Sequence, residues 1–243
     1  MKFPTKVPKK ITPCPIKEAI FELRFETDLP EEIIPGILFN KLNNVFDKGV
    51  ERLPILEMPE VIRVNEPGLK YAAHHVFLSE QYKLQIGPRA FSIICPGKYV
   101  GWTEFKKMIE FILGVIEEVN LVKKAERTGL RYVNVFESEN VYQNLKMDFS
   151  IDNNTLIGEK NSISSEFSYS DFLCLLKISN LHRNQDKNQI SIVDIDIIKN
   201  ISDDASPDFL DLVSRSHDAE KEIFFGLLKD EYLANNYNPE YED

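Results

Sequence analysis

The chain has 243 residues, of which 43% are hydrophobic and 28% charged, and 29 basic against 39 acidic side chains give a net charge of −10. This apolar content excludes a wholly disordered chain, and thirteen prolines with ten glycines are too few for a low-complexity protein. The negative charge argues against a protein that coats nucleic acid or an anionic membrane, because such surfaces require a local excess of Lys and Arg.

The cysteines and the N-terminus indicate a compartment. Cys14, Cys95 and Cys174 are far apart and form no C-x-x-C pair, so neither a disulfide framework nor a zinc site is expected. The N-terminus lacks the apolar segment of a secretory signal, and no apolar stretch approaches the roughly 18 residues of a membrane span. The expected location is the cytoplasm, without membrane association.

The predicted elements begin after residues 1–15, whose four prolines favour an extended basic arm. Residues 16–26 alternate between apolar and polar side chains, which predicts a half-buried strand. Residues 33–46 have the apolar spacing of a helix. Short strands separated by turn residues are then predicted at 61–65, 71–78, 82–86 and 91–95. Thr103 is expected to cap a helix whose apolar face runs over residues 105–119.

The elements predicted for the second part of the chain follow a similar order. A strand is predicted at 129–137, at most a short helix at 140–145, and further strands at 149–157, 166–179 and 189–199. Ser206 and Pro207 form a helix start, with serine as the cap and proline at the first helical position. That helix is predicted to continue to Leu233 and to be followed by a tyrosine-rich acidic tail.

This order predicts an α+β fold, with antiparallel sheet and helices packed on one face, because the strands come in hairpin-like runs. Two halves of the pattern βα(β)nα, residues 16–126 and 127–233, would join edge to edge into a continuous curved sheet. The arm 1–15 and the tail 234–243 would flank them. The layout resembles the duplicated saddle of TATA-box-binding-like domains, and this resemblance concerns architecture alone.

Two arginines are candidate ligand-binding residues. Arg24 and Arg131 occupy similar places in the first strands of the two halves, and a guanidinium can grip a carboxylate or phosphate with two hydrogen bonds. The alternative is that each arginine pairs with a glutamate on a neighbouring strand. Glu22, on the same strand as Arg24, belongs to this candidate set.

Trp102 and His217 complete the candidate ligand-binding residues. Trp102, the only tryptophan, is expected to pack at the start of its helix, after a segment that lacks the spacing of a phosphate-binding loop. His217 precedes Asp218, a pair found in metal-dependent phosphohydrolases, but the predicted helices supply no further ligands. Because His217 lies on an apolar stripe, a partly buried histidine bonded near Glu220 or Lys221 is favoured.

Asp194 and Asp196 lie on one face of a predicted strand. Two carboxylates at this spacing could bind a divalent ion or work as an acid/base pair, with Glu18, Glu22 or Glu166 as further partners. The alternative is a solvated face whose acids pair with Lys or Arg. These two residues are therefore only weak metal candidates, no metal site is assigned, and no cofactor is expected.

The basic arm is the one segment that favours nucleic acid. Its positive charges precede the first acid of the chain and are Lys2, Lys6, Lys9, Lys10 and Lys17. They could contact a phosphate backbone, but five charges alone are weak evidence for this, so a solvated leader is favoured.

The segment from Pro15 to Phe25 contains the motif P-x-x-E-A-I-F-E-L-R-F. Three further segments belong to the same pattern: Tyr99-x-Gly101-Trp102-x-x-Phe105, Arg127-x-Gly129-Leu130-Arg131-Tyr132-x-Asn134, and His217-Asp218-x-x-x-x-Ile223-Phe224-Phe225. Together they resemble an uncharacterised, sporadically distributed family of bacterial proteins of similar length. Because that family is uncharacterised, the resemblance implies little about chemistry. The patchy distribution is typical of accessory genes such as defence or toxin–antitoxin cargo.

The sequence therefore favours a non-catalytic binding or interaction protein of the bacterial cytosol, such as an accessory defence or antitoxin-type component. Its partner would be another protein or a second copy of the chain. Two alternatives stay open. One is a metal-dependent or acid/base enzyme that uses Asp194 and Asp196, and the other is a nucleic-acid binder that uses the sheet saddle and the basic arm.

Overall fold

The computed structural model describes residues 7–137, 140–148, 150–152, 154–155, 160–182, 189–202 and 207–241. The strands are β1 (Ile16–Glu26), β2 (Gly49–Arg52), β3 (His75–Leu78), β4 (Lys83–Ile86), β5 (Ala90–Pro96), β6 (Lys124–Glu137), β7 (Ser150–Ile151), β8 (Asn154–Thr155), β9 (Ser162–Tyr169), β10 (Phe172–His182) and β11 (Gln189–Asn200). The helices are α1 (Ile34–Leu42), α2 (Glu60–Asn65), α3 (Trp102–Glu118), α4 (Phe209–Leu227) and α5 (Asp230–Asn236), with short 3₁₀ turns η1 (Pro54–Glu57), η2 (Pro67–Leu69) and η3 (Val141–Asn144).

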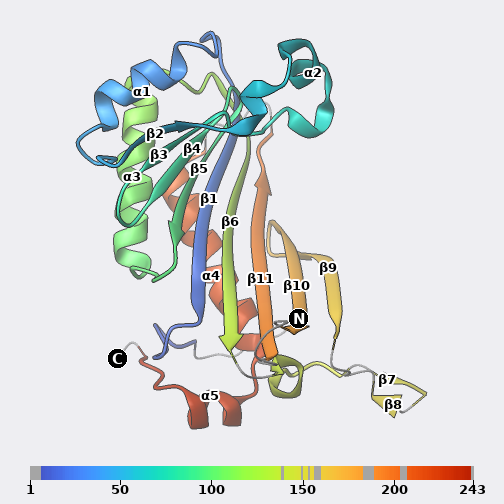
Figure 1. Cartoon of the computed structure of the whole chain (residues 1–243). Coiled ribbons are helices and arrows are strands. Elements are labelled where there is room, and N and C mark those ends of the chain that lie inside the picture. Colours follow the sequence, from blue (N-terminus) through green and yellow to red (C-terminus); the bar gives the residue numbers. More distant parts are fainter. Residues whose placement is uncertain are drawn as a thin grey trace. The chain divides into compact units, whose positions relative to one another are not determined.

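Antiparallel sheet and helices confirm the predicted α+β class. Among the described residues, nine strands form one open sheet in the order β2-β3-β4-β5-β1-β6-β11-β10-β9, and β7 pairs with β8 (Figure 1). None of the described helices is both long and apolar enough to cross a membrane. A duplication of two related halves stays a prediction.

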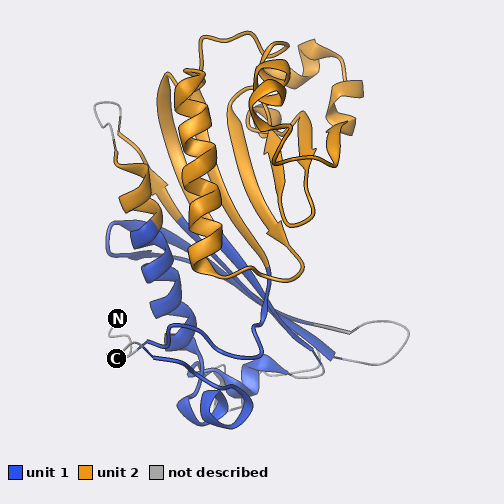
Figure 2. Cartoon of the chain, turned by 90° about the vertical axis from the view of Figure 1, so that its left-hand side faces the viewer, with its two compact units in different colours: residues 1–17, 131–197, 214–243 blue, residues 18–130, 198–213 orange. Residues whose placement is uncertain are grey.

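The chain divides into two compact units, each assembled from separate segments (Figure 2). Unit 1 comprises Met1–Lys17, Arg131–Ile197 and Ser214–Asp243, and unit 2 comprises Glu18–Leu130 and Ile198–Val213. Four elements, β1, β6, β11 and α4, contribute residues to both units. The two units are described separately below.

Unit 2 is built on the alternation predicted for residues 16–26. Its buried β1 side chains are Ala19, Phe21, Leu23 and Phe25. Strand β5 runs antiparallel to β1, with Leu23 opposite Phe91, and the Phe91 ring contacts Phe21 and Phe25. Helix α3, the long helix in front of the orange strands in Figure 2, buries the face that its apolar spacing predicted. The buried α3 residues are Phe105, Ile109, Ile112, Val115 and Ile116.

The prediction of a strand at 61–65 is wrong, because these residues belong to helix α2. Val61, Ile62 and Val64 have strand propensity, but the edge strand next to β3 is β2, which the sequence analysis did not predict. Pro59 precedes the helix, and the Asn65 side chain donates a hydrogen bond to the Val61 carbonyl at 2.7 Å. Because no described strand pairs with this segment, local hydrogen bonding decides its conformation.

Unit 1 contains a buried polar cluster between the strands and η3. Ser191, on β11, donates a hydrogen bond to Asn180 Oδ1 at 2.5 Å and accepts one from the Val141 amide at 3.0 Å. The Asn180 amide in turn donates to Asn140 Oδ1 at 2.6 Å. Ser191 and Asn180 are 0% and 1% exposed, so these bonds replace water that the groups have lost.

Three predicted elements of unit 1 are each divided into two. The described residues within 149–157 form the paired strands β7 and β8 rather than one strand. The single strand expected at 166–179 is the hairpin of β9 and β10, which turns at Ser170 with a φ of 54°. The helix expected to reach Leu233 ends at Leu227, and α5 follows. Leu228 forms a bridge with Leu145, and Lys229 N donates to a carbonyl of η3. These long-range backbone bonds compete with the helical ones, so the helix is interrupted there.

The described part of the arm, residues 7–15, is bonded to the C-terminal tail. Lys9 N donates to the Glu240 carbonyl at 2.6 Å, and Glu240 N donates to the Lys10 carbonyl at 2.9 Å. The Lys10 ammonium lies 3.0 Å from the Glu240 carboxylate. This described stretch is therefore paired with the tail at Glu240 through an isolated β-bridge, whereas Lys2 and Lys6 lie outside the described residues.

Candidate functional site

The predicted site residues of unit 2 are engaged with one another. Arg24 Nε donates to Glu22 Oε1 at 2.7 Å, and the Arg127 guanidinium lies 3.9 Å from the same oxygen. The Arg24 guanidinium also stacks over the Tyr71 ring, 4.4 Å from its centroid. Arg24 thus pairs with a glutamate of its own strand, rather than with the neighbouring-strand glutamate that the sequence suggested.

The predicted site residues of unit 1 also form an ion pair. Arg131, on β6, donates two hydrogen bonds to Asp194 on β11, at 2.7 and 2.6 Å to the two carboxylate oxygens. Among the described residues, no group of three or more His, Cys, Asp or Glu side chains is placed to hold a metal ion. Both Asp194 oxygens are occupied, which supports the structural alternative for this residue.

Trp102 and His217 occupy the elements expected for them. Trp102 is the first residue of α3, after Gly101, which has a φ of 93° that favours glycine. His217 is buried in α4, and its Nδ1 lies 3.1 Å from the Tyr132 hydroxyl. This partner comes from β6, 85 residues away in sequence, so the expectation of a local partner missed it.

The most unusual surface of unit 2 is the stretch from Leu53 to Tyr71, here called the α2 segment. No residue of η1, α2 or η2 is buried. Val61 is 71% exposed and Val64 is 69% exposed, and with Ile62 and Met58 they form the group here called the α2 patch. In Figure 1, α2 lies to the right of the upper ends of the unit 2 strands, whereas α1 and α3 lie to their left.

The arginine of this short helix points the other way. The Arg63 side chain is only 12% exposed, and its Nη1 donates to Glu31 Oε1 at 3.1 Å. The same atom lies 3.3 Å from Nδ1 of His74, which is 6% exposed. Helices of globular proteins normally bury their apolar side and expose their charges. In α2 the valines and the arginine depart from this pattern, since the valines are exposed and the arginine is mostly covered.

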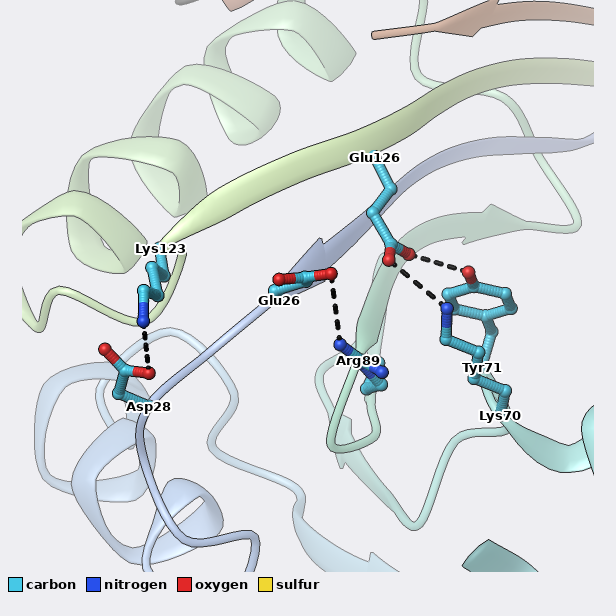
Figure 3. A network of polar contacts seen from close by, with 7 residues as sticks. All are labelled: Glu26, Asp28, Lys70, Tyr71, Arg89, Lys123 and Glu126. Carbon is cyan, nitrogen blue, oxygen red and sulfur yellow. Dashed lines mark hydrogen bonds and ion pairs between the residues drawn. The ribbon is translucent and has the colours of Figure 1, made fainter. Parts of the chain in front are cut away.

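A second anchor holds the C-terminal end of the α2 segment (Figure 3). The Tyr71 hydroxyl donates to Glu126 Oε2 at 2.6 Å, and the Lys70 ammonium lies 3.2 Å from Glu126 Oε1. Burial alone would raise the pKa of the Glu126 carboxyl, but the bonds from Tyr71 and Lys70 outweigh burial and hold that pKa below its ordinary value. Glu126 is therefore a stable anionic anchor at neutral pH.

Two further ion pairs lie near this anchor in Figure 3. Arg89 lies 3.6 Å from Glu26, and Lys123 lies 2.8 Å from Asp28. Their side chains are more exposed than that of Glu126, and exposed pairs contribute little to stability. In this network only the bonds to Glu126 attach the α2 segment.

Acidic residues border the apolar patch. Glu57, Glu60 and Glu66 are all exposed along the α2 segment, whereas Arg63, which is mostly covered, is bonded to Glu31. The outer surface of the segment therefore combines four apolar side chains with three carboxylates. Exposed apolar patches bordered by charged residues are typical of protein interaction sites.

The chain matches no protein-family model, and no curated protein matches its sequence significantly. The resemblance to a bacterial family stays a prediction. A function is therefore inferred from the arrangement of the chain's own residues.

Proposed function

We propose that the protein is a non-catalytic binding protein whose α2 patch docks a partner protein. The observation that carries this proposal is the arrangement of α2, in which Val61 and Val64 face solvent while the Arg63 side chain is only 12% exposed. Exposing two valines forgoes the free energy of burying them, roughly 1.5–3 kcal/mol per side chain. A partner that covers the patch would recover that free energy.

The partner should present apolar side chains next to Lys or Arg, because Glu57, Glu60 and Glu66 border the patch. A second copy of the chain would bring these carboxylates against one another, and an anionic membrane would repel them. Charge complementarity therefore favours a different protein with a basic, apolar docking segment. An accessory defence or antitoxin-type component would be a protein of this kind.

The α2 segment is also preorganised for docking. Leu53 N donates to the His74 carbonyl at 2.8 Å at one end, Arg63 is bonded to Glu31 in the middle, and Tyr71 is bonded to Glu126 at the other end. A surface fixed at three points loses little conformational entropy when a partner binds.

The other candidate functions have less support. The metal-dependent or acid/base use of Asp194 competes with its two hydrogen bonds from Arg131. Nucleic-acid binding through the arm competes with the pairing of Lys10 and Glu240.

Selection of peptides from a random display library against the wild-type protein tests the proposal. We expect enriched peptides that combine apolar residues with Lys or Arg. The double variant Val61→Asp/Val64→Asp should weaken their binding at least tenfold, because it places charges where apolar contact is needed. Phe111→Asp is the matched control, since Phe111 is an exposed apolar residue of α3 in the same unit, and this variant should bind the peptides normally.

Three results would contradict the proposal. Enriched peptides could bind the Val61→Asp/Val64→Asp variant as tightly as the wild type. Light scattering could show a wild-type dimer that the double variant dissociates, which would identify a second copy as the occupant. Co-sedimentation with phosphatidylserine vesicles, lost in the double variant, would identify a membrane instead.

A further inference from the structure

We infer that protonation of His74 releases the α2 segment, so that docking at the α2 patch is gated by pH. This inference rests on the proposed function and concerns the regulation of the same surface. His74 lies directly before β3, and its side chain is placed between Arg63 of α2 and Glu31 of the loop before α1. The helix is thus attached to unit 2 through a residue that titrates near neutral pH.

The geometry of the contact requires a neutral imidazole. Arg63 Nη1, which can only donate, lies 3.3 Å from His74 Nδ1, so Nδ1 must carry its lone pair to accept this bond. A proton on Nδ1 would abolish the bond and place two cations in contact. Arg63 Nε is also buried without a hydrogen-bond partner among the described residues, so the bond to Glu31 is the other contact that resists release of the guanidinium.

The charged groups around His74 act in both directions. Glu31 Oε2, 4.0 Å from Nδ1, favours the protonated ring, whereas Arg63 and the adjacent His75 oppose it. Burial is the largest influence, and together these effects hold the pKa of His74 below its ordinary value of 6.5. Burial, followed by the charge of Arg52 on β2, also lowers the pKa of the neighbouring His75.

The direction of the pH effect follows from this lowered pKa. When the α2 segment is released, His74 becomes solvated and its pKa returns toward 6.5, so the released form binds the proton more tightly than the attached form. Attachment is therefore strongest above pH 6.5 and weakens as the pH falls, by at most about tenfold per pH unit. The Glu126 anchor keeps its charge in this range, because its pKa is lowered from 4.5.

Hydrogen exchange of the wild-type protein tests the attachment without any partner. The reporter amides are those of Leu53, Arg63 and Glu66, which donate to the carbonyls of His74, Pro59 and Ile62. After correction for the intrinsic pH dependence of exchange, we expect their protection to fall up to about tenfold between pH 6.5 and 5.5. Amides of β1 and β5 should show no such change.

Two variants assign the effect to one side chain. His74→Gln can still accept a bond from Arg63 but cannot titrate, so its α2 protection should be independent of pH between about 5 and 7.5. His75→Gln is the matched control, and it should retain the pH dependence of the wild type. NMR titration of the wild-type histidines adds a readout that needs no variant, and the His74 midpoint should lie below 6.5.

The outcomes separate this inference from the proposed function. A His74 midpoint at or above 6.5, or constant α2 protection in the wild type between pH 7.5 and 5, overturns the gating even if peptides bind the patch. Selected peptides that bind the patch equally tightly at pH 7.5 and at pH 5 would also overturn the gating. Conversely, pH-dependent protection without any patch-dependent peptide binding would contradict the docking function and leave the release mechanism intact.

Discussion

Replacing Glu220 with glutamine should raise the free energy of unfolding by about 3 kcal/mol at pH 7 and by little at pH 4. Glu220, in α4 of unit 1, is 5% exposed, and burial raises the pKa of its carboxyl from 4.5 to about 8, although the nearby Lys221 charge opposes the shift. The folded chain therefore keeps the proton at pH 7, whereas the unfolded chain loses it.

The sign of the effect follows from that difference. A carboxyl whose pKa is raised on folding contributes its full stability below pH 4.5 and loses it progressively as the pH rises to about 8. Glutamine is neutral at every pH and has nearly the same shape, so the variant avoids the cost of burying the charge. The difference between variant and wild type should therefore increase from pH 4 to pH 8 and then become constant.

Urea unfolding of both proteins at pH values from about 4 to 9 measures this difference. Glu231→Gln is the control, because Glu231 is exposed in α5 of the same unit, and its stability should follow that of the wild type. Equal stability of Glu220→Gln and wild type at pH 9 would show that the Glu220 carboxyl is solvated or paired in the folded chain.

Replacing Ser191 with alanine should lower the free energy of unfolding by about 2–4 kcal/mol, because two buried groups would lose their partner at once. The Ser191 hydroxyl bonds Asn180 Oδ1 and the Val141 amide, and water cannot reach these groups at 0–1% exposure. Each buried group left unpaired costs roughly 1–3 kcal/mol.

Thermal or urea unfolding checks this value, with Ser168→Ala, at an exposed position of β9, as the control. The control should change stability by less than about 0.5 kcal/mol. If Ser191→Ala lowers the free energy of unfolding as little as the control does, another group must replace the hydroxyl as the hydrogen-bond partner. The crystal structure of the variant would then show a water or a shifted side chain in its place.

Elements in which the spacing of apolar residues follows directly from the side that is buried were predictable from the sequence. The alternation of β1 and the apolar stripe of α3 appear in the structure as expected, because each records directly which side faces the core. The pairing of Arg131 with an acid on a neighbouring strand was also anticipated as an alternative. Its partner, Asp194, was considered separately as a metal candidate, and only the pairing of β6 with β11 brings the two together.

The α2 segment could not be predicted in the same way. Its run of β-branched residues is typical of a buried strand, and the sequence alone does not show that Arg63 finds Glu31, 32 residues earlier, and His74. A warning signal was present, since the run is short and lies between Pro59 and Pro67, which hinder continuation of a strand. Glu220 was missed for a related reason, because a glutamate is normally assigned to the exposed side of a helix.

The acidic border of the α2 patch has a consequence for the behaviour of the protein at high concentration. Exposed β-branched side chains are a hazard for aggregation, and flanking charges act as gatekeepers against it. Glu57, Glu60 and Glu66 would keep two such patches apart by repulsion, which salt screens over a Debye length of about 8 Å at physiological ionic strength. Colloidal stability should therefore decrease as salt is added, and dilute, low-salt buffer should preserve the monodisperse protein.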